Sequence, residues 1–159
     1  MVDTAVCESP LGRLRLAGEH GFLTGVYFED HVNGPPIPHD ARDSPEAFHH
    51  VIAQLEEYFA GDRQVFDLPM RPIGSAFQLR VWAGLVEIEF GTTLSYGDLA
   101  NRLGDRKASR AVGLANGKNP ISIIVPCHRV IGADGSLTGY GGGLDRKLWL
   151  LRHEGALLV

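Results

Sequence analysis

The chain has 159 residues, of which 44% are hydrophobic and 21% charged, and its formal net charge is −4. That composition is ordinary for a globular protein, and the two cysteines, Cys7 and Cys127, are too far apart to form a CxxC pair. These features argue against a disulfide scaffold or a zinc finger and fit a reducing cytosol. No apolar run approaches the roughly 20 residues that span a bilayer, and no signal peptide is visible. We therefore expect a cytoplasmic protein without a membrane segment.

The two halves of the chain carry opposite charge. Residues 1–74 hold 5 Lys/Arg against 12 Asp/Glu, whereas residues 75–159 hold 10 against 7. Asymmetry of this size is common by chance, but a basic half is also what a polyanionic partner requires. With the stretch "PMRPIG" as a linker, the charge reversal predicts two domains, 1–73 and 74–159.

The first domain is expected to consist of short strands and one helix. The helix at 44–61 begins with Ser44 as its cap and Pro45 in its first turn, and it ends at Gly61. A loop at 31–40 with three prolines precedes it. The apolar face of the helix comprises Phe48, Val51, Ile52, Leu55, Tyr58 and Phe59. The strands are predicted at 4–9, 13–18, 21–29 and 64–68.

The second domain begins with a helix whose Ser75 and Gln78 form a capping-box pair. A helix capped by Ser95 then runs to Gly104, and after a tight polar turn another covers 108–117. Two short helices around a tight turn predict a helix-turn-helix. A buried strand at 121–126 is expected to follow and to lead directly to Cys127.

The second helix of this pair is basic and has a row of small residues. Its neighbourhood contains Arg102, Arg106, Lys107, Arg110 and Lys118 against Asp105 alone. Small residues permit either close packing against another helix or close approach to an external partner such as DNA. The sequence leaves both interpretations open for the row Ala108, Ala111, Gly113, Ala115 and Gly117.

Cys127 and His128 suggest nucleophilic chemistry. A cysteine reacts as thiolate, and with an ordinary pKa of about 8.5 it needs a nearby base or positive field. His128 could act as that base directly or through a water, oriented by a carboxylate. A buried structural cysteine is the alternative, and it is the simplest interpretation of Cys7.

Several motifs in order and spacing resemble one family. "PCHRV" is preceded by "RAVGLANGKNPISIIV" and followed by "GSLTGYGGGLDRKLWLLRHEG", and "FQLRVWAGL" and "TTLSYGDLA" continue the match. Together they resemble the O6-alkylguanine-DNA alkyltransferases, or methylated-DNA–protein-cysteine methyltransferases. The similarity is strong over residues 74–156 and looser before them, through "SPLGRLRLAG" and "LEEYFAG".

The resemblance implies an α+β fold, with an N-terminal ribonuclease H-like α/β domain and a C-terminal winged-helix-like domain containing the helix-turn-helix. It implies that Cys127 accepts the alkyl group from O6-alkylguanine and that His128 is the base, acting through a water. Glu154 would orient and polarise His128, and Asn119 would hydrogen-bond across the turn before the active site.

The resemblance also implies how substrate is held. Base flipping is required because the alkylated O6 lies within the stack. Arg110 would replace the flipped nucleotide, and the helix carrying Ala111 and Gly113 would enter the minor groove. Tyr96 would contact the extruded base and a phosphate. The carbonyls of Cys127 and Val130 would read the guanine amino group, with Tyr140 and the Gly141 amide closing over the base.

Two positions depart from the family pattern. "IEFG" at 88–91 replaces a proline-containing turn and brings Glu89 near the domain surface, and Gly141 stands where some relatives have serine. Some relatives bind zinc in the first domain. Here Cys7 shows no ligand spacing with the scattered histidines, so we expect no metal and no cofactor. Those histidines are His20, His31, His39, His49 and His50.

Three other functions agree less well with these residues. A non-catalytic protein that binds flipped, damaged bases would not need Cys127, and a helix-turn-helix regulator would leave "PCHRV" and Glu154 without purpose. A cysteine hydrolase would need an oxyanion hole and turnover. The expected partner is therefore double-stranded DNA containing O6-alkylguanine. We expect a monomer, with cooperative assembly along DNA left open.

Overall fold

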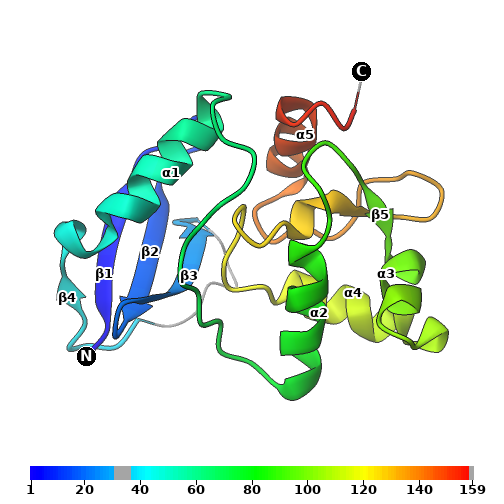
Figure 1. Ribbon diagram of the computed structural model, residues 1–159, viewed down its shortest axis with the longest axis horizontal. Coiled ribbons are helices and arrows are strands. Elements are labelled where there is room, and N and C mark those ends of the chain that lie inside the picture. Colours follow the sequence, from blue (N-terminus) through cyan, green and yellow to red (C-terminus); the bar gives the residue numbers. More distant parts are fainter. Residues whose placement is uncertain (31–36, 158–159) are drawn as a thin grey trace.

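The computed structural model describes residues 1–30 and 37–157 and shows two domains side by side (Figure 1). The fold is α+β, as predicted. His31 and the rest of 31–36, within the expected loop, lie outside the described residues. In the part of the chain that is described, no helix is both long and apolar enough to cross a bilayer.

The N-terminal domain is a small sheet with a helix on one face (Figure 1). The strand order is β3-β2-β1-β4, with β1 to β3 antiparallel and β4 parallel to β1. The first three strands confirm those predicted at 4–9, 13–18 and 21–29. The elements are β1 (Asp3–Cys7), β2 (Leu14–Glu19), β3 (Phe22–Phe28), β4 (Arg42–Asp43), the 3₁₀ turn η1 (Pro45–Phe48) and α1 (His49–Phe59).

Helix α1 confirms the predicted helix but not its cap. The first predicted turn is the 3₁₀ turn η1, and the Ser44 side chain makes no capping hydrogen bond. At the other end Gly61 has a φ of 85°, a left-handed conformation that suits glycine and ends the helix. The predicted apolar face is buried at Phe48, Val51, Leu55 and Tyr58 and partly buried at Ile52 and Phe59.

The C-terminal domain is mainly helical. The capping box of Ser75 and Gln78 and the cap at Ser95 are both confirmed. Trp82 of α2 donates its indole N–H to the Ala115 carbonyl over 2.8 Å, which ties α2 to α4. The elements are α2 (Ala76–Val86), β5 (Leu94–Ser95), α3 (Tyr96–Arg102), η2 (Arg106–Ala108), α4 (Ser109–Gly117), η3 (Cys127–Arg129), β6 (Val130–Ile131) and α5 (Leu144–His153).

The strand predicted at 64–68 is wrong. This segment forms no ladder, and Val65 is 75% exposed. The chain pairs with β3 only beyond it, where Met70 forms an isolated bridge with Leu23. An alternating apolar pattern predicts a strand only where a neighbouring backbone edge is available, and here the segment crosses between the domains instead.

The strand predicted at 121–126 is also wrong. Only Ile121 pairs, through a bridge with Val26 of β3, and the following residues form buried turns in which Ile123 has a φ of 72°. Periodicity cannot distinguish a buried apolar turn from a buried strand. The chain before Cys127 is nevertheless anchored to the N-terminal sheet, because Val26 donates to the Pro120 carbonyl and Ser122 donates to the Val26 carbonyl.

Candidate active site

Asn119 shapes the segment that precedes Cys127. Its side-chain amide donates to the carbonyls of Ile121 (3.2 Å) and Val125 (2.9 Å), and its oxygen accepts from the Ile121 N–H (3.0 Å). These bonds satisfy backbone groups that a strand would have paired with a neighbour. Asn119 therefore hydrogen-bonds across the segment between α4 and Cys127, which is a loop and not the expected strand, and its role in the reaction stays a prediction.

Cys127 begins the 3₁₀ turn η3 and is only 5% exposed. Burial raises the pKa of its thiol, and this outweighs the lowering by the Asn119 side chain and the Lys147 charge. The thiol is therefore neutral at pH 7, and it becomes a nucleophile only if a base removes its proton. Cys7 lies in β1, partly buried, where burial and two nearby carboxylates raise its thiol pKa to about 11.

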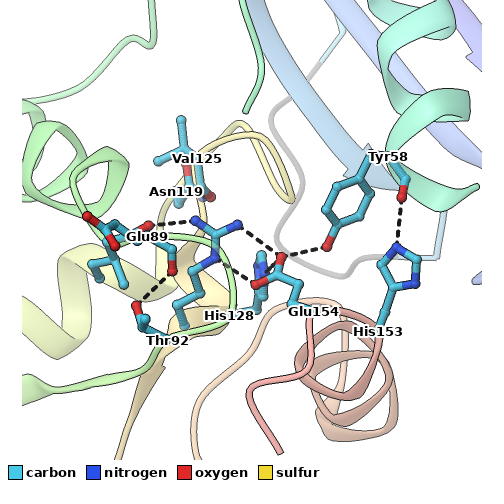
Figure 2. Close-up of polar contacts among 10 residues, drawn as sticks. Tyr58, Glu89, Thr92, Asn119, Val125, His128, His153 and Glu154 are labelled. Carbon is cyan, nitrogen blue, oxygen red and sulfur yellow. Dashed lines mark hydrogen bonds and ion pairs between the residues drawn. The ribbon is translucent and has the colours of Figure 1, made fainter. Parts of the chain in front are cut away.

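His128 and Glu154 are brought together across the domain (Figure 2). The His128 Nε2 atom lies 2.8 Å from Glu154 Oε2, and both side chains are fully buried. Burial lowers the pKa of His128, so its ring is neutral at pH 7. Burial alone would raise the pKa of Glu154, but the hydrogen bonds from His128 and Arg129 and the positive charge of Arg129 lower it to about 2.

These protonation states identify the basic atom of His128. An ionised carboxylate can only accept hydrogen bonds, so Nε2 carries the proton and donates it to Glu154. The remaining ring nitrogen, Nδ1, keeps its lone pair, and among the described residues this buried atom has no hydrogen-bond partner. An unpaired buried acceptor beside a reactive residue suits a general base.

Helix α4 presents an exposed basic face. Arg110 and Ala111 point to solvent, and Leu114, one turn further on, is 68% exposed. Gly113 is half-buried, and a Cβ placed on it would lie 3.6 Å from the Tyr96 ring. The row of small residues thus has members on both faces of α4. Gly113 packs beside Tyr96, where an added Cβ would make only an ordinary contact, and Ala111 lies on the exposed face without a long side chain.

The segment 132–143 lies next to the start of α3. The Tyr96 hydroxyl donates to the Thr138 carbonyl over 3.1 Å. The Tyr140 ring is buried against Phe28, with ring centroids 6.5 Å apart, and Gly141 is exposed beside it. Tyr140 lies close enough to Cys127 for the two groups to interact electrostatically. The contacts of Tyr96, Tyr140 and Gly141 with an extruded base stay a prediction.

Comparisons with known proteins agree with this arrangement. Residues 3–72 match the model of the ribonuclease-like domain of 6-O-methylguanine DNA methyltransferase, and residues 76–156 match that of its DNA binding domain. The chain is 49% identical over 152 residues to the methylated-DNA–protein-cysteine methyltransferase of Methanosarcina acetivorans, covering 96% of this chain and 97% of that one.

Relatives from Mycobacterium tuberculosis are equally similar. The methylated-DNA–protein-cysteine methyltransferase of strain H37Rv is 49% identical over 154 residues, covering 97% of this chain and 93% of that one. The crystal structure of the O6-methylguanine methyltransferase from this organism has a TM-score of 0.91 at 47% identity, covering 98% and 94% of the two chains. A structure of the M. tuberculosis OGT in complex with DNA has the same TM-score at 46% identity, covering 97% and 93%.

The chain belongs to the methylated-DNA–protein-cysteine methyltransferase family. Its two domains are accordingly a ribonuclease-like domain and a DNA-binding domain, as the fold prediction had them. The motifs that carried the strong part of the resemblance fall within residues 74–156, which the second family model covers almost completely.

Two cations to which the sequence analysis assigned no role bind groups of this site. Arg129 donates from Nε to Glu154 Oε1 (2.7 Å), from Nη2 to Oε2 (3.0 Å) and from Nη1 to the Ile88 carbonyl (2.6 Å). Lys147 is fully buried, and its ammonium donates to the carbonyls of Val130 (2.6 Å) and Thr138 (2.7 Å). Arg129 stands within "PCHRV", and a basic residue so close to a reactive cysteine was the signal that could have identified it.

Lys147 also affects the predicted role of Val130. Burial lowers the pKa of Lys147 to about 8, so its ammonium is still mostly protonated at pH 7. The Val130 carbonyl accepts from Lys147, and the Cys127 carbonyl accepts from the Asn116 side chain over 3.4 Å. The Val130 carbonyl has a second lone pair for a guanine amino group, whereas the Cys127 carbonyl already accepts a second hydrogen bond, from the Val130 N–H. A guanine amino group at the Cys127 carbonyl would have to share it with these donors.

The other sequence expectations for the family site concern Glu89 and metal. Glu89 is exposed in the connection after α2, as expected for its departure from the family turn. Among residues 1–30 and 37–157, no three His, Cys, Asp or Glu side chains gather closely enough to hold a metal ion.

Proposed function

We propose that this protein repairs DNA by transferring an alkyl group from O6-alkylguanine to the sulfur of Cys127. The observation that carries the proposal is the buried neutral thiol next to His128, whose Nε2 is held by ionised Glu154 and whose Nδ1 is unpaired. The relatives named methylated-DNA–protein-cysteine methyltransferases support the same reaction.

The transfer requires three linked changes of bonding. The Cys127 proton passes to His128 Nδ1 through a water, and Glu154 stabilises the imidazolium that forms. The thiolate attacks the alkyl carbon in line, so that an S–C bond forms as the C–O6 bond breaks. The electrons of that bond leave with guanine O6, and the guanine takes up the proton that His128 received.

DNA binding is assigned to the exposed face of α4. Arg110 and Lys118 supply positive charge there, and Ala111 lets the helix backbone approach the floor of the minor groove. With the target nucleotide flipped out, Arg110 would fill its place in the stack. Tyr96 and Tyr140 would then contact the extruded base.

The domain boundary lies between residues 73 and 74 in this proposal. The two family models end at 72 and begin at 76, and the capping box that starts α2 begins at Ser75. We also infer a monomer acting in the cytoplasm, because the reaction needs Cys127 reduced and a reducing compartment keeps it so. Cooperative assembly along DNA is compatible with this inference but is not required by it.

A mass measurement tests the proposed transfer. The protein is incubated with a duplex containing O6-methylguanine, digested, and the peptide containing Cys127 is weighed; we expect a gain of one CH2. Cys127→Ser is the matched control, because serine keeps the shape but its hydroxyl is a far weaker nucleophile at neutral pH. That variant should bind the duplex without any gain. Binding by the unsubstituted protein without a mass gain would indicate a damage-binding protein instead.

A further inference from the structure

Tyr58 is a residue of the N-terminal domain whose hydroxyl reaches the active-site carboxylate. It lies near the end of α1 and is 0% exposed. Its hydroxyl donates to Glu154 Oε2 over 2.6 Å, between residues 96 positions apart in the chain (Figure 2). This bond is the shortest of the four that Glu154 accepts from Tyr58, His128 and Arg129.

The tyrosine ring is held in place on several sides. Phe59 and Phe66 lie 5.2 and 5.4 Å from it, and Phe90 lies 6.3 Å away, measured between ring centroids. His153, the residue before Glu154, contacts the ring at 5.0 Å and lies with Nε2 2.7 Å from the Tyr58 carbonyl. The Tyr58 hydroxyl therefore contacts Glu154, and the Tyr58 ring and backbone carbonyl contact the preceding residue, His153.

The direction of the hydrogen bond does not change over the working pH range. Burial and the neighbouring Glu154 charge raise the pKa of Tyr58 far above its ordinary value, so the hydroxyl stays protonated. Glu154, with a pKa lowered to about 2, stays ionised and accepts. A purely apolar interface would be served by phenylalanine, since a buried hydroxyl is unfavourable unless it has a partner.

We propose that Tyr58 is a positioning residue for alkyl transfer, which fixes Glu154 Oε2 so that the carboxylate holds His128 with Nδ1 turned toward the Cys127 side. The N-terminal domain thereby contributes directly to the chemical step and not only to stability. This inference rests on the proposed function, because it needs His128 to act as the base.

Removal of the Tyr58 hydroxyl should change the stability of the His128 imidazolium in one direction. Without the Tyr58 donor, Oε2 has more electron density available for the His128 proton, so the imidazolium is stabilised. The groups that face His128 are Glu154, which favours the imidazolium, and Arg129 and Lys147, which oppose it. In Tyr58→Phe the acidic limb of the rate profile should therefore move to higher pH, and the maximal rate should fall because the carboxylate is less well fixed.

The test uses the full chain and the free base O6-benzylguanine, whose reaction does not depend on DNA binding. We expect Tyr58→Phe to react about 10- to 150-fold more slowly, the loss expected for one hydrogen bond to a charged group. Duplex DNA should be bound as tightly as before. Tyr27→Phe, which removes a hydroxyl from β3 of the same domain, is the control and should react at the original rate.

A double-mutant cycle separates positioning from general packing. Glu154→Asp retains the charge but withdraws the carboxylate, so Tyr58→Phe should have little further effect in that background. An unchanged rate and pH profile in Tyr58→Phe would overturn the inference, as would losses that multiply fully with those of Glu154→Asp. If the unsubstituted protein fails to react with O6-benzylguanine and with alkylated DNA, the proposed function fails instead.

Discussion

At the scale of single residues, the site depends on charges that are buried in pairs. The carboxylate of Glu154 and the guanidinium of Arg129 are both almost inaccessible to water and are joined by two hydrogen bonds. A buried charge without its partner is strongly destabilising, although a complete pair contributes little net stability. The same pair keeps Glu154 ionised and so keeps the proton of His128 on Nε2.

The substitution Glu154→Gln should therefore reduce stability in a pH-dependent way. At pH 7 it leaves Arg129 unpaired, and we expect a loss of about 3–5 kcal/mol in the free energy of unfolding. The pKa of Glu154 in the folded protein is lowered to about 2, against about 4.3 for an ordinary Glu. The carboxylate therefore contributes its full stabilisation of the folded state above about pH 4.3, and this stabilisation is lost as the pH falls toward 2.

Urea unfolding at pH 7 and at pH 3 measures this effect. The difference between the unsubstituted protein and Glu154→Gln should be smaller at pH 3. Glu89→Gln, which changes an exposed carboxylate in the same domain, should have almost no effect at either pH. An equal difference for Glu154→Gln at both pH values would show that its carboxylate does not contribute through its charge.

At the scale of elements, α4 connects the proposed DNA-binding face with the turn that contains Cys127. The helix ends at Gly117, and Asn119 then folds the chain back so that Cys127 lies behind the helix. Asn116 on the inner face donates to the Cys127 carbonyl, whereas Arg110 on the outer face is exposed. A short buried loop thus couples the two faces, and the outer face can change without altering the thiol.

Arg110→Ala should slow repair of duplex DNA by roughly 10-fold or more while leaving the reaction with free O6-benzylguanine unchanged, because only the duplex needs the flipped base replaced. Single-turnover rates with both substrates measure this. Arg13→Ala, in the N-terminal domain, is the control. Equal slowing with both substrates would show that Arg110 acts on folding or chemistry.

Higher salt should weaken duplex binding by the unsubstituted protein, because binding neutralises phosphates.

At the scale of the whole molecule, polar bonds join the two domains at several places. Arg146 of α5 pairs with Asp30 over 2.7 Å and donates to the Leu11 carbonyl over 3.0 Å. The β3 edge binds the segment before Cys127, and Tyr58 binds Glu154. The N-terminal domain thus contacts the C-terminal domain at three places, one of them next to Cys127 in the sequence and one at Glu154.

Each molecule is expected to act once. Transfer to Cys127 would give a thioether, which has no good leaving group and is not reversed by thiol exchange. Cys7, the other free cysteine, lies in β1 of the N-terminal domain and has its thiol pKa raised to about 11, so it cannot take over the group. With excess methylated DNA, product should stop at one methyl per active molecule. Several rounds without added reagents would contradict a stoichiometric acceptor.

The sequence by itself determined the features that depend on neighbouring residues. The caps at Ser75 and Ser95 and the stop at Gly61 follow from local hydrogen bonding and local backbone conformation, and the structure confirms them. The motif "PCHRV" indicated the family because adjacent residues remain adjacent in any fold. Cys127 and His128 could therefore be proposed as nucleophile and base from the sequence alone.

Only the tertiary structure decided features that depend on distant partners. Residues 121–126 became a loop because the Asn119 side chain and one edge of β3 took their backbone hydrogen bonds, a competition that apolar composition does not reveal. Tyr58 was predicted only as part of an apolar helix face, and its hydroxyl gained its meaning when α1 packed against the end of α5. A side chain's local pattern indicates whether it is buried, but the fold decides which polar group it meets there.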